Sequence, residues 1–411
     1  MLQRSERLIV FLIGAVQFIN ILDFVMVMPL GPDFAKPLGI PTSHLGYIAG
    51  SYTAAASVAG LAGAFFLDRF DRRRALAAAM LGLGVATALG GMATGLAELL
   101  AARVLAGLFG GPATSLSFAI IADVVPTERR GRAMGAVMGA FAAANVLGLV
   151  AGLELARLGG WRLPFFGVGA LGLLITAATF ALLPPLVGHL EAVREHPEST
   201  FSSLLRKRDT QLSYVMTALV MLSGFLLIPN ISAYAQRNLG FDRARLSEVY
   251  ALGGVTSFLT TRYGGRLVDR VGSLTVVTVG VVLVIATQWQ FFLAPSGLDL
   301  HVFMVAFMLA MGLRNVAYNT LVTKVPDASE RARFGSLQSA VGHAAAAAGA
   351  FVSSQMLGSD GQERLVGIER VVYVATALTI LVPPLVAIVE RRVRARIRVA
   401  SAMLGRRVES R

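Results

Sequence analysis

The stretch Leu67-Asp68-Arg69, followed by Arg72-Arg73-Arg74, is a short charged turn between two long apolar segments. A second copy, Val268-Asp269-Arg270, begins at position 268 instead of 67, an offset of 201. The dipeptide Val125-Pro126 recurs as Val325-Pro326 at an offset of 200, and acidic and basic residues follow both prolines. Two separate features at nearly one offset indicate that the chain is built from two repeated halves.

Apolar segments extend outward from these turns along the whole chain. Hydrophobic residues make up 55% of the 411 residues and charged residues only 15%, whereas soluble globular chains carry about 25% charged residues. Crossing a ~30 Å hydrocarbon core takes roughly 20 apolar residues. Twelve segments meet this length: 8–30, 45–67, 75–94, 97–121, 132–154, 163–187, 211–235, 246–267, 274–294, 301–323, 333–356 and 367–389.

The longest polar stretch divides these segments six and six. We predict an N-terminal six-helix half at 1–187, a cytoplasmic linker at 188–211, a C-terminal six-helix half at 212–390 and a basic cytoplasmic tail at 391–411 that lies on anionic lipid. The fold class is therefore an all-α membrane protein with 12 transmembrane helices in two pseudo-symmetric halves. Two such halves with a site between them are typical of transporters.

The net charge of +13 follows from membrane topology. Of 37 Lys and Arg residues, about 27 lie in loops on the side of both termini, and such loops are normally cytoplasmic. The sequence therefore predicts a multi-pass protein of a bacterial-type inner (plasma) membrane with both termini in the cytoplasm. Because topology accounts for the basic residues, we expect no nucleic-acid partner.

At these motifs the sequence resembles the major facilitator superfamily over its whole length. Within the superfamily it is most similar to the twelve-helix drug–proton antiporter and small-solute efflux branch. The family's loop motif G-x-L-x-D-R-x-G-R is matched by the second-half stretch Gly265-Arg266-Leu267-Val268-Asp269-Arg270-Val271-Gly272. The first-half copy departs from it, since Ala64 and Asp71 stand where glycines are usual.

Three further motifs bear on the branch. Arg103-Val104-Leu105-Ala106-Gly107 resembles the fourth-helix motif, and Leu22-Asp23 with the prolines that follow resembles the first-helix motif. The antiporter motif of the fifth helix is degraded: its proline is missing, and its positions hold Ala144, Gly148, Leu149 and Gly152. This loss weakens the antiporter assignment more than the superfamily assignment.

Two charges lie deep inside predicted spans. Asp23 is about 22 Å above the cytoplasmic start of its segment, and Arg103 is about 21 Å above the same face on a 1.5 Å rise per residue. The resemblance to the superfamily implies that the first and fourth helices meet at the central cavity. We therefore predict an ion pair that works as a proton switch, because protonation of Asp23 would release Arg103. The alternative is a static pair that fixes helix packing.

His343 is the second candidate proton carrier, because histidine titrates near neutral pH. The alternative for this residue is a buried neutral histidine that is hydrogen-bonded to a neighbour such as Gln338 or to a backbone carbonyl. No candidate metal site accompanies it, because the five histidines lack metal-ligand spacing.

Polar side chains inside other predicted spans are candidates for the wall of a substrate cavity. Arg314 could bind an anionic substrate group, or it could close the inner gate or extend to the interface. The amides are equally suited to bonding between helices. The candidate cavity residues are Asn20, Asn145, Asn230, Arg314, Asn315, Tyr318 and Gln338.

The resemblance also implies a cytoplasmic gate, a charge network that latches the halves when the transporter faces outward. On the matching positions it would comprise Asp68, Arg69, Arg72, Arg73, Asp123, Arg132, Asp269 and Arg270. The second half has Thr323 where Asp123 would recur, so we expect its latch to be weaker. The alternative is that these charges only set topology.

Taken together, these patterns predict a secondary active transporter that exports a small amphipathic or hydrophobic compound against proton entry by alternating access. Alternatives of the same fold are a solute uptake symporter, a sugar exporter and a lipid or lysolipid transporter. An alternative of another class is a membrane sensor or assembly partner that transports nothing.

The chain has no cysteine and no G-x-x-x-x-G-K phosphate loop. We therefore expect no enzymatic activity and no cofactor, with the proton gradient as energy source. The expected partners are a small-molecule substrate, protons and membrane lipids, and we expect a monomer.

Overall fold

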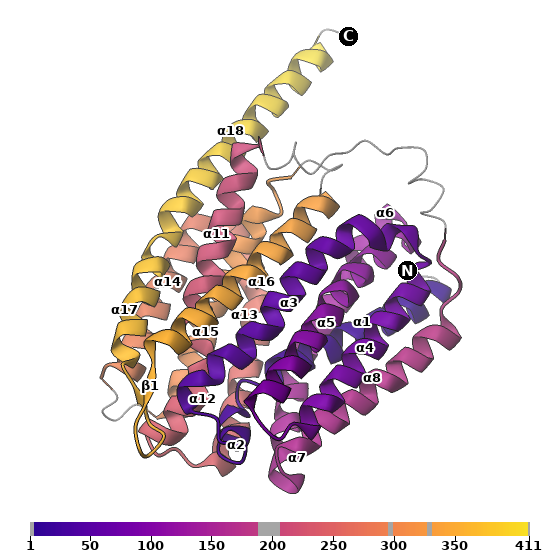
Figure 1. Cartoon of the computed structure of the whole chain (residues 1–411). Helices are drawn as coiled ribbons and strands as arrows, with labels where there is room; N and C mark the ends of the chain where they lie inside the picture. The colour runs from indigo at the N-terminus through magenta and orange to yellow at the C-terminus, as the bar shows by residue number, and fades with distance from the viewer. Residues whose placement is uncertain (1–3, 188–205, 295–298, 327–330, 410–411) are drawn as a thin grey trace.

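The computed structural model of the protein describes residues 4–187, 206–294, 299–326 and 331–409. Long helices run side by side through an elongated bundle (Figure 1). Helices suit this apolar chain because a segment in lipid must satisfy its backbone hydrogen bonds internally. The predicted all-α membrane fold is confirmed.

The first half contains six long helical segments, two of which contain a change of helix type or a short accessory helix. Their bounds are α1 (Arg4–Met26) with α2 (Gly31–Ala35), η1 (Thr42–His44), α3 (Leu45–Phe66), η2 (Leu67–Arg69), α4 (Arg72–Met92), α5 (Leu96–Val124), α6 (Thr127–Ala143) continued by η3 (Ala144–Gly148) and α7 (Leu149–Gly159), and α8 (Arg162–Leu182).

The second half repeats this arrangement. Its elements are α11 (Arg208–Phe225), η4 (Ile228–Asn230), α12 (Ile231–Ala233), η5 (Tyr234–Asn238), η6 (Arg243–Arg245), α13 (Leu246–Val271), α14 (Ser273–Phe292), α15 (Leu300–Val322), α16 (Arg331–Met356), β1 (Gly358–Ser359), β2 (Leu365–Val366), α17 (Ile368–Ile380) and α18 (Val382–Glu409). The two short strands pair antiparallel and form a hairpin that the sequence did not predict.

Nine of the described helical segments are long and apolar enough to cross a membrane. Three more long helices, α3, α13 and α16, have 22, 26 and 26 residues and complete the twelve predicted spans. These three helices are rich in small and polar residues, and all three lie at the interface between the two halves. Because α3 packs against α16, and α13 packs against α7 and η3, each meets the other half of the protein along one face.

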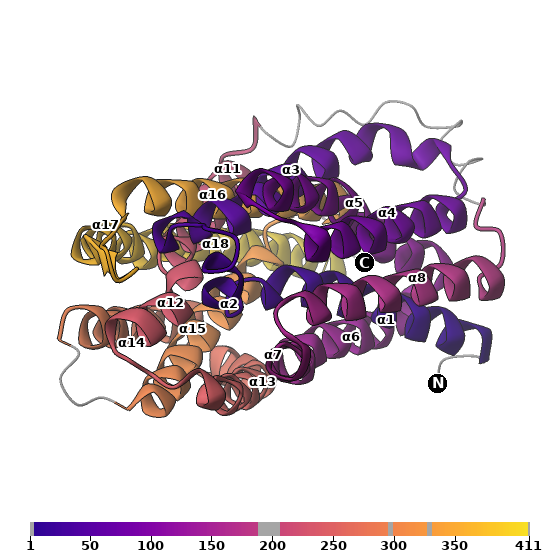
Figure 2. The same cartoon turned by 60° about the horizontal axis from the view of Figure 1, so that its bottom comes forward.

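The bundle has two ends, which we name by what lies there. The tail side holds the turn Leu67–Arg69 and the end of α18, which extends beyond the other helices (Figure 1). The hairpin side holds β1 and β2, and there α2 lies between the two halves (Figure 2). The sequence predicts that the tail side is cytoplasmic.

Glycines allow the close approach of the two halves at α3 and α16. A Cβ atom at Gly46 would lie 2.4 Å from the carbonyl oxygen of Ala350, and one at Gly50 would lie 2.5 Å from the ring of Phe351. Any larger side chain at these two positions would push the helices apart. The close contact between the two halves therefore depends on the small residues of α3.

Two of the predicted spans are interrupted: 211–235 is divided after Phe225 into α11, η4, α12 and η5, and 367–389 is divided at Leu381 into α17 and α18. The linker prediction at 188–211 falls mostly outside the described residues, and α11 begins at Arg208. The range predicted as a basic tail is helical as far as Glu409, because α18 continues unbroken from Val382. Arg and Ala, which are good helix formers, are frequent in this range.

Candidate functional site

Asp23 of α1 and Arg103 of α5 are in direct contact inside the first half. Nη1 of Arg103 donates to both carboxylate oxygens, at 2.9 and 3.1 Å, and Nη2 lies 3.4 Å from the backbone oxygen of Asp23. Asp23 is 0% exposed and Arg103 is 1% exposed. In such a low-dielectric site the two charges stabilise each other, and removing either would leave the other buried without its partner.

Neighbouring polar side chains extend this ion pair into a buried network. Thr87 of α4 donates to Asp23 Oδ1 at 2.7 Å. Cζ of Arg103 lies 4.7 Å from the centre of the Tyr52 ring, and the Tyr52 hydroxyl donates to Asn20 Oδ1 at 2.9 Å. The network therefore joins four helices of the first half, α1, α3, α4 and α5.

Tyr52 also connects this network to the second half. Its ring stacks on Phe24 at a centroid distance of 5.2 Å. Phe24 in turn stacks on Phe225 of α11 at 5.9 Å. A change at the ion pair can therefore reach the interface between the halves through two aromatic contacts.

The Asn20 side chain is buried and hydrogen-bonded to α5, whereas a residue that lines a cavity would have a free polar group. Its amide nitrogen donates to the Gly110 carbonyl at 3.0 Å and to the Thr114 hydroxyl at 2.7 Å, and the residue is 2% exposed. Asn230 is 0% exposed and donates to Ser353 on α16 at 2.8 Å. Both amides thus bond neighbouring helices, which matches the alternative weighed for them.

Arg314 of α15 is the second fully buried transmembrane arginine. It is 1% exposed, and its Nη2 lies 3.5 Å from Oδ1 of the adjacent Asn315. Its Nε and Nη1 have no hydrogen-bond partner within the described part of the chain. Tyr318, one turn further along α15, is also buried, whereas Asn315 is half-buried.

The remaining candidates lie at half-buried positions. Asn145 lies in the π-helical turn η3 (Ala144–Gly148). His343 and Gln338 are both on α16. Within the described residues neither makes a side-chain hydrogen bond, so the expected bond between them is not formed here.

On the hairpin side, a dense set of polar contacts joins the halves. Arg243 donates to both carboxylate oxygens of Asp33, with distances of 2.6 to 2.8 Å. Ser232 donates to the Pro29 carbonyl at 2.9 Å, and Ser359 of the β-hairpin accepts from the Ser43 backbone at 3.0 Å. These contacts close the hairpin side.

Towards the tail side, the bonds between halves become sparse. The deepest hydrogen bond between halves in the described structure runs from Ser57 to the Ala340 carbonyl, at 2.8 Å. Ser57 is about 18 Å along α3 from the hairpin side, near the middle of the bundle. The ion pairs nearer the tail side, such as Arg72–Asp123 and Arg392–Asp209, stay within one half.

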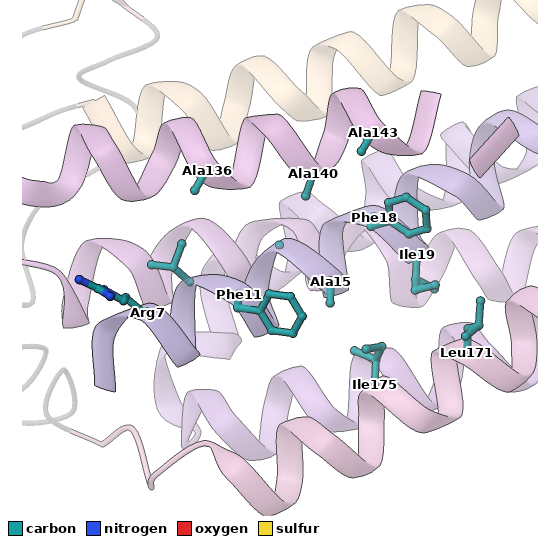
Figure 3. A pocket seen from close by; sticks show the side chains of 12 residues that line it. Arg7, Phe11, Ala15, Phe18, Ile19, Ala136, Ala140, Ala143, Leu171 and Ile175 are labelled. Atoms are coloured by element: carbon teal, nitrogen blue, oxygen red, sulfur yellow. The ribbon is translucent and has the colours of Figure 1, made fainter. Parts of the chain in front are cut away.

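An apolar groove of about 630 Å³ lies on the surface of the first half, between α1, α6 and α8 (Figure 3). Phe11 is 71% exposed there, and Arg7 stands at the tail-side end as the groove's charged residue. The network around Asp23 uses the other face of α1. The groove is therefore separate from the buried polar groups.

Comparison with known proteins agrees with this architecture. The family model for the Major Facilitator Superfamily matches residues 13–350. The chain belongs to the Major Facilitator Superfamily. It is therefore a multi-pass membrane transporter of that superfamily.

Among curated members of the superfamily, a chloramphenicol resistance protein of Streptomyces lividans is 25% identical over 81% of this chain and 85% of its own length. Multidrug resistance protein 2 of Bacillus subtilis is 21% identical over 72% of this chain and 77% of its own.

Solved structures of superfamily members share the fold. One is a bacterial homologue of the human lysosomal transporter Spinster in an inward-facing, unoccupied conformation, with a TM-score of 0.73, 17% identity and coverage of 95% of this chain and 98% of that one. Another is a D-xylose–proton symporter, with a TM-score of 0.71, 19% identity and coverage of 93% and 96%.

Of the gate residues that the superfamily motif implies, the structure joins two. Arg72 Nε lies 2.5 Å from Asp123 Oδ2. Arg73 instead donates to the Leu183 carbonyl at 3.2 Å and lies over the Phe180 ring. Arg132 is exposed and does not contact Asp123 in the described structure, so the predicted network is only partly formed.

Three further gate residues lie exposed on the tail side. Arg69, Asp269 and Arg270 are exposed and have no ion-pair partner among the described residues, and the Asp68 side chain is outside the described set. In the second half, α18 makes the tail-side contacts: Arg396 donates to the Lys324 and Val325 carbonyls at 2.7 and 2.8 Å.

One departure from the superfamily motif has a structural reason. Asp71 stands where a glycine is usual, and its side chain accepts from the Arg73 backbone at 3.0 Å as the N-cap of α4. It also accepts from the Leu186 backbone at 2.9 Å. A capping aspartate at this position stabilises the first turn of α4.

Other functional candidates were not found by sequence reasoning. Tyr52, Thr87 and Thr114 are polar residues in largely apolar helices, and nothing in their spacing marks them as functional. Asp33 of α2 and Arg243 of η6 belong to opposite halves and are separated by 210 positions. Only the folded arrangement shows that these residues belong together.

Proposed function

We propose that this protein exports a small amphipathic compound in exchange for protons, by alternating access. The observation that carries the proposal is the Asp23–Arg103 ion pair, buried inside the first half and coupled through Tyr52 and Phe24 to Phe225 of the second. The resistance functions in the names of two relatives favour export. In this proposal Asp23 is the proton carrier.

Protonation of Asp23 would remove the charge that holds Arg103. The guanidinium would then keep only its contacts with neutral groups, among them the Tyr52 ring. Since that ring stacks on Phe24 against the other half, movement of Arg103 would change the stability of the closed hairpin side. A proton thereby shifts the balance between two conformations, as coupling requires.

The arrangement of contacts suits a state that is open to the cytoplasm. With the tail side cytoplasmic, the Asp33–Arg243 pair and the hairpin close the outer side. The gate residues around Asp68 and Arg72 would contact the second half only when the cytoplasmic side closes. In the proposal Arg314, Asn315, Tyr318, Gln338 and Asn145 face the compound during transport. His343 is a second proton carrier, and the protein works as a monomer in a bacterial-type plasma membrane.

The test uses purified protein in proteoliposomes that contain the pH dye pyranine, with chloramphenicol as first probe because a relative confers resistance to it. Addition of the probe should cause proton movement in wild type and none in Asp23→Asn. Glu98→Gln, which changes an exposed carboxylate at the start of α5, is the matched control and should remain active.

Equal proton coupling in Asp23→Asn of normal melting temperature would reject the proposed carrier. Proton movement with the compound, rather than against it, would indicate an uptake symporter. Absence of flux for a panel of amphipathic probes that nevertheless bind would favour the sensor alternative.

A further inference from the structure

The two buried transmembrane arginines of this protein are in opposite electrostatic situations. Arg103 and Arg314 are both 1% exposed. Arg103 is neutralised by a carboxylate of its own chain, whereas two of the three guanidinium nitrogens of Arg314 have no acceptor in the described structure. A buried charge without a partner is strongly unfavourable, so it is kept only where it has a use.

The helices around Arg314 place no acid beside it. On α13, which packs against α15, Glu248 and Asp269 are exposed and lie 12 and 9 residues from Thr260, the residue that Gly312 contacts. The described helices α14, α15 and α16 contain neither aspartate nor glutamate. On α11, Gly224 lies beside the guanidinium, whereas Asp209 lies 15 residues away, about 22 Å along the helix. Asp209 is moreover paired with Arg392.

The packing next to the guanidinium leaves it beside a residue with no side chain. A Cβ atom at Gly224 would stand 3.8 Å from Nη2 of Arg314 and 3.8 Å from the Met311 methyl group. On the other side, Gly280 of α14 fits against the Arg314 backbone, where a Cβ would be 2.7 Å from its nitrogen. The arginine is therefore fixed at its backbone and has a small residue facing its charged end.

We propose that Arg314 binds an oxyanion, a carboxylate or a group of like geometry, on the amphipathic compound that the protein exports. The planar guanidinium matches a carboxylate with two parallel hydrogen bonds. Met311 and Tyr318 supply apolar and aromatic surface on the same helix. The inference rests on the proposed export function and specifies its substrate class.

A first experiment asks whether Arg314 has a partner in its own chain. The melting temperatures of the purified protein, Arg314→Met and Arg103→Met are compared without ligand. Arg314→Met should melt at or above the wild-type temperature, because an unpaired charge is replaced by an apolar chain. Arg103→Met should melt lower because it strands Asp23. If Arg314→Met is destabilised as much as Arg103→Met, the proposal fails.

A second experiment tests the ligand class. Benzoate, 1-naphthoate and biphenyl-4-carboxylate are compared with the three corresponding amides by their shift of the melting temperature. At least one acid should bind wild type about tenfold more tightly than its amide. Arg314→Met should remove this difference, Arg314→Lys should retain part of it, and the exposed control Arg266→Met should leave it unchanged.

Equal or absent stabilisation of wild type by acids and amides over all three skeletons overturns the inference. Because binding is measured without a gradient, it is independent of the proton-flux test. Acid-selective binding without proton coupling would reject the proposed function alone, and coupled flux without acid selectivity would reject this inference alone.

Discussion

Arg243 of the second half grips both carboxylate oxygens of Asp33 in the first half, at 2.6 to 2.8 Å. Its Nη2 also reaches the Leu153 carbonyl at 3.4 Å. This fork connects α2, α7 and the turn η6 at the point where the halves meet. Opening of the hairpin side requires that it break.

Removal of this pair should shift the protein towards the state that is open on the hairpin side. Arg243→Ala and Asp33→Ala should each increase labelling of a single cysteine placed at Ser232, which now donates to the Pro29 carbonyl. The cysteine-free chain makes such labelling specific. The charge swap Asp33→Arg with Arg243→Asp should restore protection. Unchanged labelling in both single variants would show that the pair does not hold this side closed.

A covalent bond across the same side should stop transport reversibly. The hydroxyl oxygens of Ser43 and Ser359 are 3.2 Å apart, a separation that suits a disulfide between cysteines at these positions. Ser43→Cys with Ser359→Cys should lose transport on oxidation and regain it on reduction. Each single cysteine is its own control. Full turnover with a complete disulfide would mean that these two residues do not separate during the cycle.

For proton-coupled flux, the aromatic ring of Tyr52 should be more important than its hydroxyl group. Tyr52→Phe loses the bond to Asn20, which costs about 1 kcal/mol, but keeps the ring beside Arg103 and Phe24. Tyr52→Leu removes the aromatic contacts as well and should reduce proton-coupled flux far more than Tyr52→Phe. The measurements are melting temperature and probe-dependent proton movement. If both variants have the same flux, the aromatic path between the pair and Phe225 carries no coupling.

Closure of the tail side should bring the glycines of α6 against α13. Val146 contacts Gly254 of α13, and Gly139 and Gly135 lie 7 and 11 positions before it, on nearly the same helical face. A Cβ at either glycine meets nothing within 4 Å in this conformation. Gly135→Leu and Gly139→Leu should therefore fold normally and yet slow transport.

The control for added bulk is Ala78→Leu, at an exposed position of α4. It should retain normal transport. If the two glycine variants transport as fast as this control, the tail-side parts of α6 and α13 do not approach one another.

Asp71 should contribute to stability rather than to transport chemistry. Loss of an N-cap aspartate costs about 1 kcal/mol, and Asp71 also holds the Leu186 backbone. Asp71→Ala should lower the melting temperature, while Asp71→Asn, which can still cap, should lower it less. A large fall in transport at unchanged stability in Asp71→Asn would instead assign this residue to the gate.

Local sequence determined a large part of the fold. Each apolar run must become a helix in lipid, so the twelve spans followed from length and hydropathy. The two halves followed from the nearly constant offset of their turns. The contact between Asp23 and Arg103 was anticipated from their equal depth along their own helices, together with the resemblance to the superfamily, which implied that the first and fourth helices meet.

The residues around that pair could not be found in the same way. Tyr52 and Thr87 have ordinary neighbours in sequence, and their partners are on other helices. The amides illustrate the same limit, since Asn20 and Asn230 looked like cavity residues until their buried partners were known. A helix rotation of a few tens of degrees would have exposed them, and sequence periodicity in an almost uniformly apolar helix does not specify that rotation.

The sequence by itself determined the class, the number of spans, the duplication and the side on which charges gather, since these depend on local hydrophobicity and short-range pattern. The tertiary structure decided which side of the bundle is closed, through Asp33 and Arg243, and which buried arginine is paired. Those outcomes depend on contacts between residues that are 80 to 210 positions apart. Such contacts arise only from how the helices pack and turn, and they are where the proposed transport chemistry resides.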